Sequence, residues 1–307
     1  FVQFLGWFEI PKTLYIVMEY LPEGDLTKHL SSPLPLETVQ TISKQILEGL
    51  KVMHEKGMAH RDLKPANILV VSTSPCRVKL GDFGISKRIS PQGNIAFQTH
   101  VGTQSYCAPE VLGLDPCSET SMYTNSVDIW SLGCVIYELL VGARLFASVT
   151  QVSRYLHGKD PFPEFTLKRL SIPVDNAGIS LLKSMLTIQP EGRPTAASAL
   201  GHAWLAGLER HKTYVGEGNN GHKMVEVWIN CQELGRDAFG EAYKQVSRTT
   251  GNHRAIKRID KRRLPPTLSN SSELHMTDIL AKVCPLFPRG FAPVYCPSMI
   301  SLLWSNV

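Results

Sequence analysis

Two short segments hold the polar side chains with the most distinct chemistry in the sequence. Residues 60–67 (HRDLKPAN) place an aspartate, a lysine and an asparagine close together, and residues 81–84 (GDFG) contain a further aspartate. Carboxylate and amide oxygens are the ligands that Mg²⁺ prefers, and a lysine ammonium group pairs with phosphate. These residue types therefore suit a site for a magnesium-bound phosphate compound. The alternative is that Asp62 and Asp82 are ordinary loop acids that cap helices or turns.

The order and separation of these segments resemble the signature motifs of the protein kinases. The first of them, residues 60–67, is called the catalytic loop below. Residues 108–110 (APE) form a third motif of the set. The lysine two residues after Asp62 resembles the serine/threonine branch of the family. The segment from Asp82 to Glu110 is similar to calmodulin-dependent and checkpoint kinases. The resemblance implies an α+β fold with a small antiparallel β lobe and a larger, mainly helical lobe. It also implies a serine/threonine protein kinase, a transferase that moves the γ-phosphate of ATP to Ser or Thr hydroxyls of a protein substrate.

The resemblance assigns roles to residues of the large lobe. Asp62 would orient the acceptor hydroxyl, and Lys64 would place a positive charge near the transferred phosphoryl group. Thr103 would hydrogen-bond near both and favour Ser or Thr acceptors. Asn67 and Asp82 would hold Mg²⁺. Phosphoryl transfer depends mainly on positioning and on cations around the spreading charge, so these residue types suit the reaction.

Three further residues resemble structural contacts of the family. Glu110 and Arg193 would form a buried ion pair that holds the large lobe together, and Asp128 would anchor the backbone of the catalytic loop. A phosphate on Thr99 could pair with Arg61, although any exposed loop contains hydroxyl groups.

Residues 15–21 (YIVMEYL) resemble the strand and hinge that meet the adenine ring. Met18 would guard the back of the adenine pocket, a role that is compatible with plain core packing. The backbone of Glu19 and Leu21 would meet the adenine edge, and Asp25 could reach the ribose. The resemblance thus implies ATP and Mg²⁺ as cofactors.

The segments that resemble the other nucleotide-binding elements come last in this sequence, whereas in a kinase they come first. Residues 234–242 (LGRDAFGEA) resemble the glycine-rich loop, and residues 255–257 (AIK) resemble the strand with the phosphate-pairing lysine, Lys257. Glu273 lies where the glutamate partner of that lysine would be. The other residues expected to contact the nucleotide are Leu234, Gly235, Gly240, Ala242 and Ala255.

The glycine-rich segment departs from the family pattern Gly-x-Gly-x-x-Gly. Asp237 stands where the second glycine is expected, and Ala242 stands where a valine is expected. The aspartate adds a side chain and a negative charge near the nucleotide, a repulsion of about 1 kcal/mol or more at moderate effective dielectric. We therefore expect weaker ATP binding than in a typical kinase.

The hydrophobic pattern predicts the elements that position these residues. β-Branched and aromatic runs predict a hairpin from residues 1–9 and 14–20, and apolar residues three and four apart predict an amphipathic helix over 37–56. The most apolar stretch, 129–149, contains two charged residues, so it is typical of a buried helix rather than a membrane span, and the helix itself is predicted over 127–141. Further patterns predict strands over 68–71, 77–80, 225–234, 241–249 and 253–260, and helices over 152–157, 177–186, 195–205 and 271–283.

The expected division of the chain is permuted relative to a kinase. It comprises small-lobe strands and hinge (1–21), the large lobe (22–208), a glycine-rich linker (209–224), the glycine loop, lysine strand and helix of the small lobe (225–283), and an irregular tail (284–307). An extended linker would reach roughly 55–60 Å, enough to cross a compact chain about 50 Å wide. A linker of this length would allow the chain to fold as a circular permutant. Alternatively, the chain would be a tandem-kinase fragment that joins the end of one kinase to the start of a second. Two alternatives remain: a weakly active or inactive kinase-like scaffold or binding module, and a fragment completed in a strand-exchanged dimer.

The composition limits the protein class and its compartment. With 43% hydrophobic residues, 19% charged residues and a net charge of +5, the 307 residues are those of a globular protein. Seven cysteines without paired spacing argue against disulfides or zinc and favour an intracellular compartment, cytoplasmic or nuclear. The basic run over 254–263 could be a nuclear-import or nucleic-acid patch, but a solvated strand end is favoured, so we expect no nucleic-acid partner. The kinase resemblance implies a protein substrate, and we expect no membrane partner. Because the first residue is Phe1, we expect that further sequence precedes it.

Overall fold

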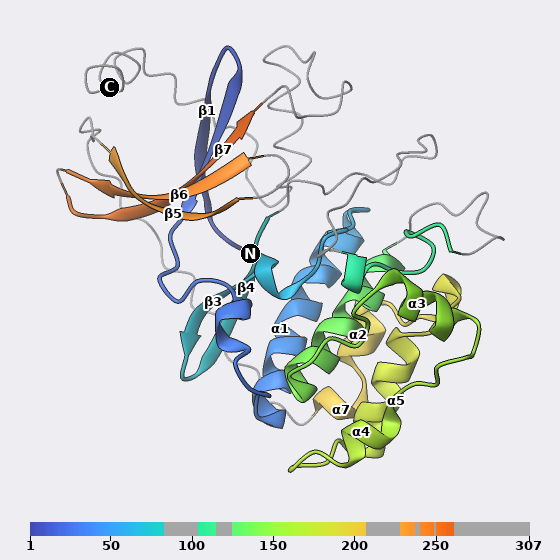
Figure 1. Ribbon diagram of the computed structural model, residues 1–307. Helices are drawn as coiled ribbons and strands as arrows, with labels where there is room; N and C mark the ends of the chain where they lie inside the picture. Colours follow the sequence, from blue (N-terminus) through green and yellow to red (C-terminus); the bar gives the residue numbers. More distant parts are fainter. Residues whose placement is uncertain (83–103, 115–124, 207–227, 237–239, 249, 261–307) are drawn as a thin grey trace. The chain divides into compact units, whose positions relative to one another are not determined.

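The computed structural model describes residues 1–82, 104–114, 125–206, 228–236, 240–248 and 250–260 (Figure 1). These residues divide into two compact units. The first unit contains residue 1 and residues 21–206, and the second contains residues 2–20 and 228–260. The second unit therefore combines two segments that are far apart in the sequence.

The second unit is built on a five-stranded antiparallel sheet. Its strands are β1 (Phe4–Ile10), β2 (Thr13–Glu19), β5 (Trp228–Arg236), β6 (Gly240–Ser247) and β7 (His253–Asp260). The strand order is β1-β2-β7-β6-β5, so the N-terminal hairpin, blue in Figure 1, continues directly into the orange C-terminal strands. β2 pairs with β7 over its whole length, from Thr13 opposite Asp260 to Glu19 opposite Arg254.

The first unit is mainly helical. Its longest helices are α1 (Leu36–Glu55), α2 (Ser126–Val141) and α5 (Asn176–Met185), and β3 (Ile68–Thr73) pairs with β4 (Cys76–Leu80) in a two-stranded sheet. The shorter helices are α3 (Val149–Leu156), α4 (Glu164–Lys168), α6 (Ala196–Leu200) and α7 (Ala203–Ala206), and the 3-10 turns are η1 (Leu26–His29), η2 (Pro65–Asn67), η3 (Gln104–Tyr106) and η4 (Pro190–Gly192).

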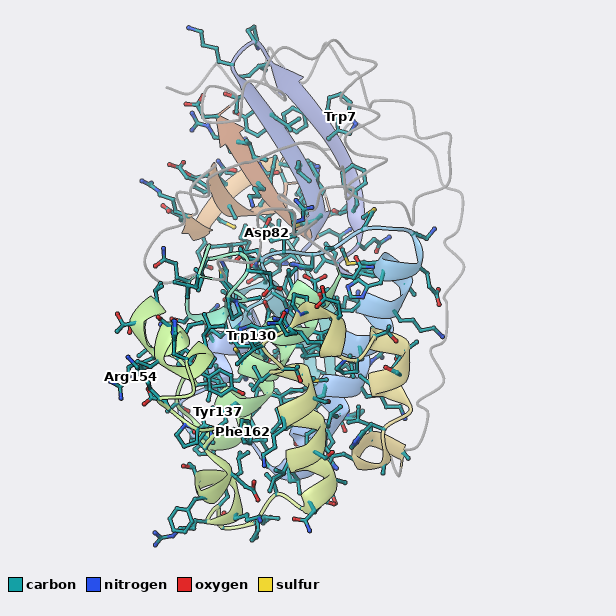
Figure 2. All side chains as sticks on the ribbon, turned by 90° about the vertical axis from the view of Figure 1, so that its right-hand side faces the viewer. Trp7, Asp82, Trp130, Tyr137, Arg154 and Phe162 are labelled. Carbon is teal, nitrogen blue, oxygen red and sulfur yellow. The ribbon has the colours of Figure 1, made fainter. Side chains whose placement is uncertain are left out.

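Helix α2 lies in the hydrophobic core of the first unit because its sequence is apolar on nearly every side. Trp130, labelled in Figure 2, and Leu132 are fully buried. The helix ends at Gly142, whose φ of 76° is the left-handed conformation that glycine adopts readily. α1 is amphipathic, and residues such as Ile42 and Ile46 on its buried face belong to the same core. No helix among the described residues is both long and apolar enough to cross a bilayer.

The predicted elements agree with the structure in kind and differ in their limits. The helix predicted over 195–205 is divided into α6 and α7, because α6 ends before Gly201. The helix predicted from residue 152 begins at Val149, because the side chain of Ser148 accepts a hydrogen bond from Gln151 N and caps it. The predicted linker, the helix over 271–283 and the tail lie outside the described residues.

Candidate active site

The buried carboxylate of Asp128, in the first turn of α2, holds the start of the catalytic loop. Its Oδ2 accepts a hydrogen bond from His60 N and its Oδ1 accepts one from Arg61 N, both at 2.8 Å. His54 Nε2 lies 2.9 Å from Oδ2. Arg61 has a φ of 67°, a conformation that is costly for a residue with a side chain. The anchoring role predicted for Asp128 is therefore confirmed, and it stabilises a strained turn.

The catalytic loop binds one carboxylate oxygen of Asp62, and the other has no hydrogen-bond partner among the described residues. Lys64 Nζ donates to Asp62 Oδ2 at 2.8 Å, and Asn67 Nδ2 donates to the same oxygen at 3.0 Å and to the Asp62 carbonyl at 2.7 Å. Asp62 Oδ1 is buried and accepts no hydrogen bond from the described residues. The carboxylate is thus fixed in orientation, with one acceptor atom available to a hydroxyl group.

Gly81 connects the catalytic loop to Asp82. Gly81 N donates to the Asn67 carbonyl at 2.9 Å, and His60 Nε2 donates to the Gly81 carbonyl at 3.1 Å. Asp82 is the second residue after β4 and has a left-handed φ of 52°. These bonds bring the segments of Asn67 and Asp82 together, as their predicted common role requires.

The residues near Asp82 suit a metal ion that takes few protein ligands. The described part of the chain contains no group of three or more His, Cys, Asp or Glu side chains that could hold a metal. Mg²⁺ commonly binds one or two protein oxygens and completes its shell with phosphate and water. Asn67 uses its Nδ2 as the donor to Asp62, so its Oδ1 is the atom suited to a metal. The Asp82 carboxylate and the Asn67 amide therefore fit Mg²⁺ bound to a nucleotide.

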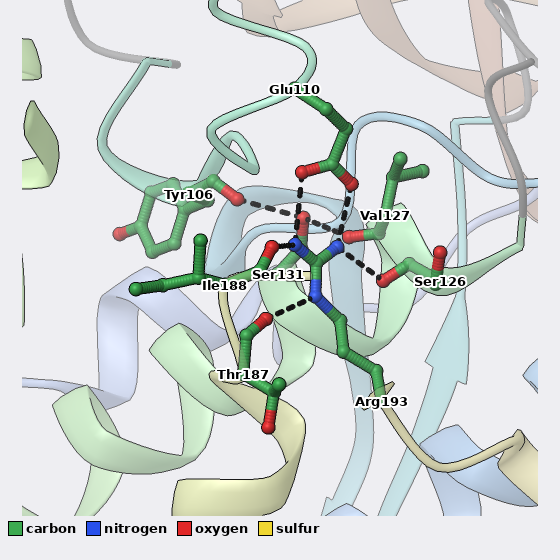
Figure 3. A network of polar contacts seen from close by, with 8 residues as sticks. All are labelled: Tyr106, Glu110, Ser126, Val127, Ser131, Thr187, Ile188 and Arg193. Carbon is green, nitrogen blue, oxygen red and sulfur yellow. Dashed lines mark hydrogen bonds and ion pairs between the residues drawn. The ribbon is translucent and has the colours of Figure 1, made fainter. Parts of the chain in front are cut away.

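A buried ion pair links residues 104–114 to the rest of the first unit (Figure 3). Arg193 Nη1 and Nη2 donate to the two carboxylate oxygens of Glu110 at 2.6 and 2.9 Å. Arg193 also donates to the carbonyls of Thr187 and Ile188, and its guanidinium lies 5.0 Å from the centre of the Trp130 ring. The predicted ion pair between Glu110 and Arg193 is confirmed, and the Arg193 guanidinium also has backbone carbonyls as hydrogen-bond acceptors.

Cys107 is a neighbour of the catalytic loop that sequence reasoning missed. The pKa of its thiol is raised to about 11, mainly by burial and to a smaller extent by the charge of Asp62, while the charge of Lys64 opposes the rise. The thiol therefore lies within electrostatic reach of both side chains. The sequence contained only an indirect signal, the position of this cysteine immediately before residues 108–110.

In the second unit, four predicted nucleotide-contacting residues lie on one face of the sheet. Directly opposed residues of antiparallel strands project from the same face, and so do alternate residues of one strand. Met18 on β2 is opposite Ala255 on β7, and Ala242 on β6 is opposite Lys257 on β7. Ala255 and Lys257 are two positions apart. Residues from both ends of the chain thus form a single surface.

Gly240 is required by the sheet itself. It is buried at the start of β6, and a Cβ atom there would lie 1.9 Å from the Arg258 carbonyl oxygen. A Cβ atom at Gly235 would meet nothing within 4 Å. Leu234 and Gly235 belong to β5, so the segment predicted as a loop is largely strand.

The predicted hinge residues are already engaged in local contacts. Glu19 N donates to the Gln3 carbonyl at 2.9 Å, and the Leu21 carbonyl accepts from Gly24 N at 3.1 Å. The Asp25 carboxylate caps η1 by accepting from Thr27 N at 2.9 Å. A ribose contact by Asp25 would have to share this carboxylate with its own helix.

Several predicted residues lie outside the described part of the chain. They are Thr99, Thr103, Asp237 and Glu273, and their roles stay predictions.

Comparison with known proteins supports the interpretation of the first unit. The model of the protein kinase domain family matches residues 1–205, a match that ends before β5. Serine/threonine-protein kinase RAD53 of Saccharomyces cerevisiae is 36% identical over 215 residues, which are 66% of this chain and 26% of that protein. Serine/threonine-protein kinase cds1 of Schizosaccharomyces pombe is 36% identical over 222 residues, 71% of this chain and 47% of that protein. The chain thus spans less than half the length of these two relatives.

Solved structures show the same similarity. The crystal structure of Rad53 1–466 in complex with AMP-PNP has a TM-score of 0.55 and 33% identity, covering 66% of this chain and 50% of that one. The crystal structure of the Rad53 kinase domain and SCD2 has a TM-score of 0.54 and 32% identity, and the match covers 66% of this chain and 70% of that one.

Proposed function

The chain belongs to the protein kinase domain family, and from this premise we propose that it transfers the γ-phosphate of ATP to Ser or Thr hydroxyls of a protein substrate. Both relatives named above are serine/threonine kinases, and one similar structure holds AMP-PNP, an ATP analogue. A protein substrate with Ser or Thr and an intracellular location belong to the same proposal.

The geometry of Asp62 carries this proposal. The acceptor hydroxyl would donate to Asp62 Oδ1, the buried oxygen that accepts no other bond from the described residues. The hydroxyl oxygen would attack the γ-phosphorus, the bond from that phosphorus to the β–γ bridging oxygen would break, and the hydroxyl proton would pass to Asp62. Lys64, held against Oδ2, adds positive charge beside the reacting group.

Asn67 and Asp82 would hold the magnesium ion that accompanies ATP. When bound, Mg²⁺ supplies positive charge that offsets the phosphate oxygens. The contribution of the protein is to hold the two oxygen ligands, through the bonds that Gly81 makes with Asn67 and His60.

The nucleotide-binding strands would come from both ends of the chain. Strands β5–β7 lie beyond the family match, yet β7 pairs with β2 and supplies Ala255 and Lys257 to the face that carries Met18. In this proposal Lys257 neutralises phosphate, with Glu273 as its partner, and the chain is a permuted kinase rather than a tandem-kinase fragment.

The proposal is tested by phosphate transfer to a generic basic protein and by ATP titration. Asp62→Asn should lower kcat by roughly 10²–10⁴-fold while ATP affinity stays within about twofold, since the side chain acts on the acceptor proton. The matched control is Asp160→Asn, which removes an exposed acid paired with Arg154. Equal kcat values for Asp62→Asn and the unaltered chain would refute the assignment. ATP binding without turnover in the unaltered chain would instead support a scaffold.

Mixing two inactive variants distinguishes the permuted monomer from a strand-exchanged dimer. Asp62→Asn and Lys257→Met place their defects in different units. In a monomer, no chain in the mixture has both residues, so activity should stay absent. In an exchanged dimer, Asp62 of one copy can act with Lys257 of another, and up to about a quarter of the activity should return.

A further inference from the structure

Tyr106, Glu138 and Arg144 form a polar cluster that the reaction outlined above does not use. The Tyr106 hydroxyl donates to Glu138 Oε2 at 2.6 Å. Arg144 Nε lies 3.8 Å from Glu138 Oε1, and the Arg144 guanidinium carbon lies 5.9 Å from the centre of the Tyr106 ring. The cluster joins η3 to the end of α2 and the turn that follows it.

The exposed part of this cluster is its positive member. The side chain of Arg144 is 48% exposed, that of Glu138 is 12% exposed, and Tyr106 is buried. One oxygen of Glu138 is occupied by the tyrosine hydroxyl, and burial together with this bond raises the pKa of Tyr106, which keeps the phenol protonated as the donor. A molecule that approaches from solvent therefore meets the guanidinium before the carboxylate.

The cluster is connected to the catalytic loop through η3. Tyr106 ends η3 and its carbonyl accepts a hydrogen bond from Ser131 Oγ at 2.8 Å, which holds the turn against α2. The next residue, Cys107, interacts with the charges of Asp62 and Lys64. Tyr106 thus contacts the Arg144 cluster, and the next residue, Cys107, lies within electrostatic reach of Asp62. The cluster therefore adjoins the site at which the acceptor hydroxyl would lie.

We propose that Arg144 binds an acidic side chain of the acceptor peptide, so that the chain favours Ser or Thr sites with a nearby Asp or Glu. This inference rests on the proposed kinase function. A guanidinium group can donate two parallel hydrogen bonds to a carboxylate, and it repels a basic side chain in the same place. Arg144 is held loosely at this site: its Nε lies 3.8 Å from Glu138 Oε1, and it also interacts with the Tyr106 hydroxyl. Because its side chain is 48% exposed, a carboxylate from solvent can reach the guanidinium in competition with these contacts.

Matched peptides test this preference. Each peptide has one acceptor Ser among Ala and Gly residues, with a single Asp, Ala or Arg moved through the flanking positions. At low salt the Asp peptide should have a KM about fivefold lower than the Ala peptide at one or more positions, and the preference should weaken at high salt. Arg144→Gln should bring that KM ratio to about one and improve binding of the Arg peptide, because Glu138 is then uncovered. Arg144→Lys should keep part of the preference, since it keeps the charge and loses the paired donors.

The control is Arg154→Gln, which removes another exposed arginine of the first unit and should leave the preference unchanged. A preference for Arg peptides in the unaltered chain, or an Asp preference that survives Arg144→Gln, would overturn the inference. Peptide binding to Asp62→Asn, followed by fluorescence anisotropy, makes the test independent of turnover. If turnover is absent but this binding shows the Asp preference, the proposed function fails and the acidic-peptide site stands; equal binding of all peptides refutes the site.

Discussion

Lys257 on β7 lies directly opposite Ile16 on β2, although the two residues lie near opposite ends of the sequence. The strand that carries the predicted phosphate-binding lysine is therefore central in the sheet, between β2 and β6. Each of its neighbours comes from a different part of the chain. Any change that separates β7 from β2 should remove the surface on which Met18, Ala255 and Lys257 lie together.

Shortening Ile256 should weaken the second unit selectively. Ile256 and its partner Val17 are both buried where β7 meets β2. Ile256→Ala should cost about 2–4 kcal/mol of stability in this unit and reduce ATP binding. Hydrogen exchange should then accelerate in β1 and β2 and stay unchanged in α2. The exposed neighbour Arg258→Ala is the control, and equal effects of both variants would contradict the prediction.

The two glycines of β5 and β6 should differ sharply in their tolerance of alanine. Gly240→Ala places Cβ against the Arg258 carbonyl, so roughly 2–4 kcal/mol of stability should be lost. Gly235→Ala meets open space and should change stability by less than about 1 kcal/mol. Urea unfolding followed by a probe in the second unit measures both. Similar losses would show that β6 and β7 do not approach as described.

Removing one partner of the buried Glu110–Arg193 ion pair should lower stability more than replacing both partners with apolar residues. Arg193→Met leaves the buried Glu110 carboxylate without its partner, and about 3–5 kcal/mol of stability should be lost. The double variant Arg193→Met/Glu110→Leu should recover part of that loss, because no charge remains buried. A double-mutant cycle in urea provides the measurement. A double variant less stable than Arg193→Met would rule out this account.

The thiol of Cys107 should resist alkylation at neutral pH. Burial raises its pKa from 9.0 to about 11, so at pH 8 it holds about 100-fold less thiolate than an ordinary thiol. Because the folded-state pKa is the higher one, the neutral thiol stabilises the fold below about pH 9, and this contribution is lost as the pH rises through about 11.

Iodoacetamide labelling read by mass spectrometry checks this behaviour. Exposed Cys231 should label first at pH 8, and Cys107 should follow only as the pH approaches 11. Labelling of Cys107 as fast as Cys231 at pH 8 would show that its thiol is accessible and ionised.

The residues of the catalytic loop could be predicted from the sequence because their chemistry depends on short, fixed spacings. Asp62, Lys64 and Asn67 lie within one loop, and their mutual hydrogen bonds follow from that proximity. The apolar pattern of α2 likewise predicted its burial. The Glu110–Arg193 pair was predicted from family resemblance alone, since the two residues are far apart in the chain.

Only the tertiary structure decided which strands pair. Alternating hydrophobicity marks β2 and β7 as strands, but it contains no information on their partner or register, because pairing depends on hydrogen bonds between distant backbone segments. The structure also showed that Gly240 is required by close packing, that the Asp25 carboxylate caps η1, and that Cys107 lies within electrostatic reach of Asp62. The sequence by itself thus determined the residue types and local elements, and three-dimensional packing determined which of them share a surface.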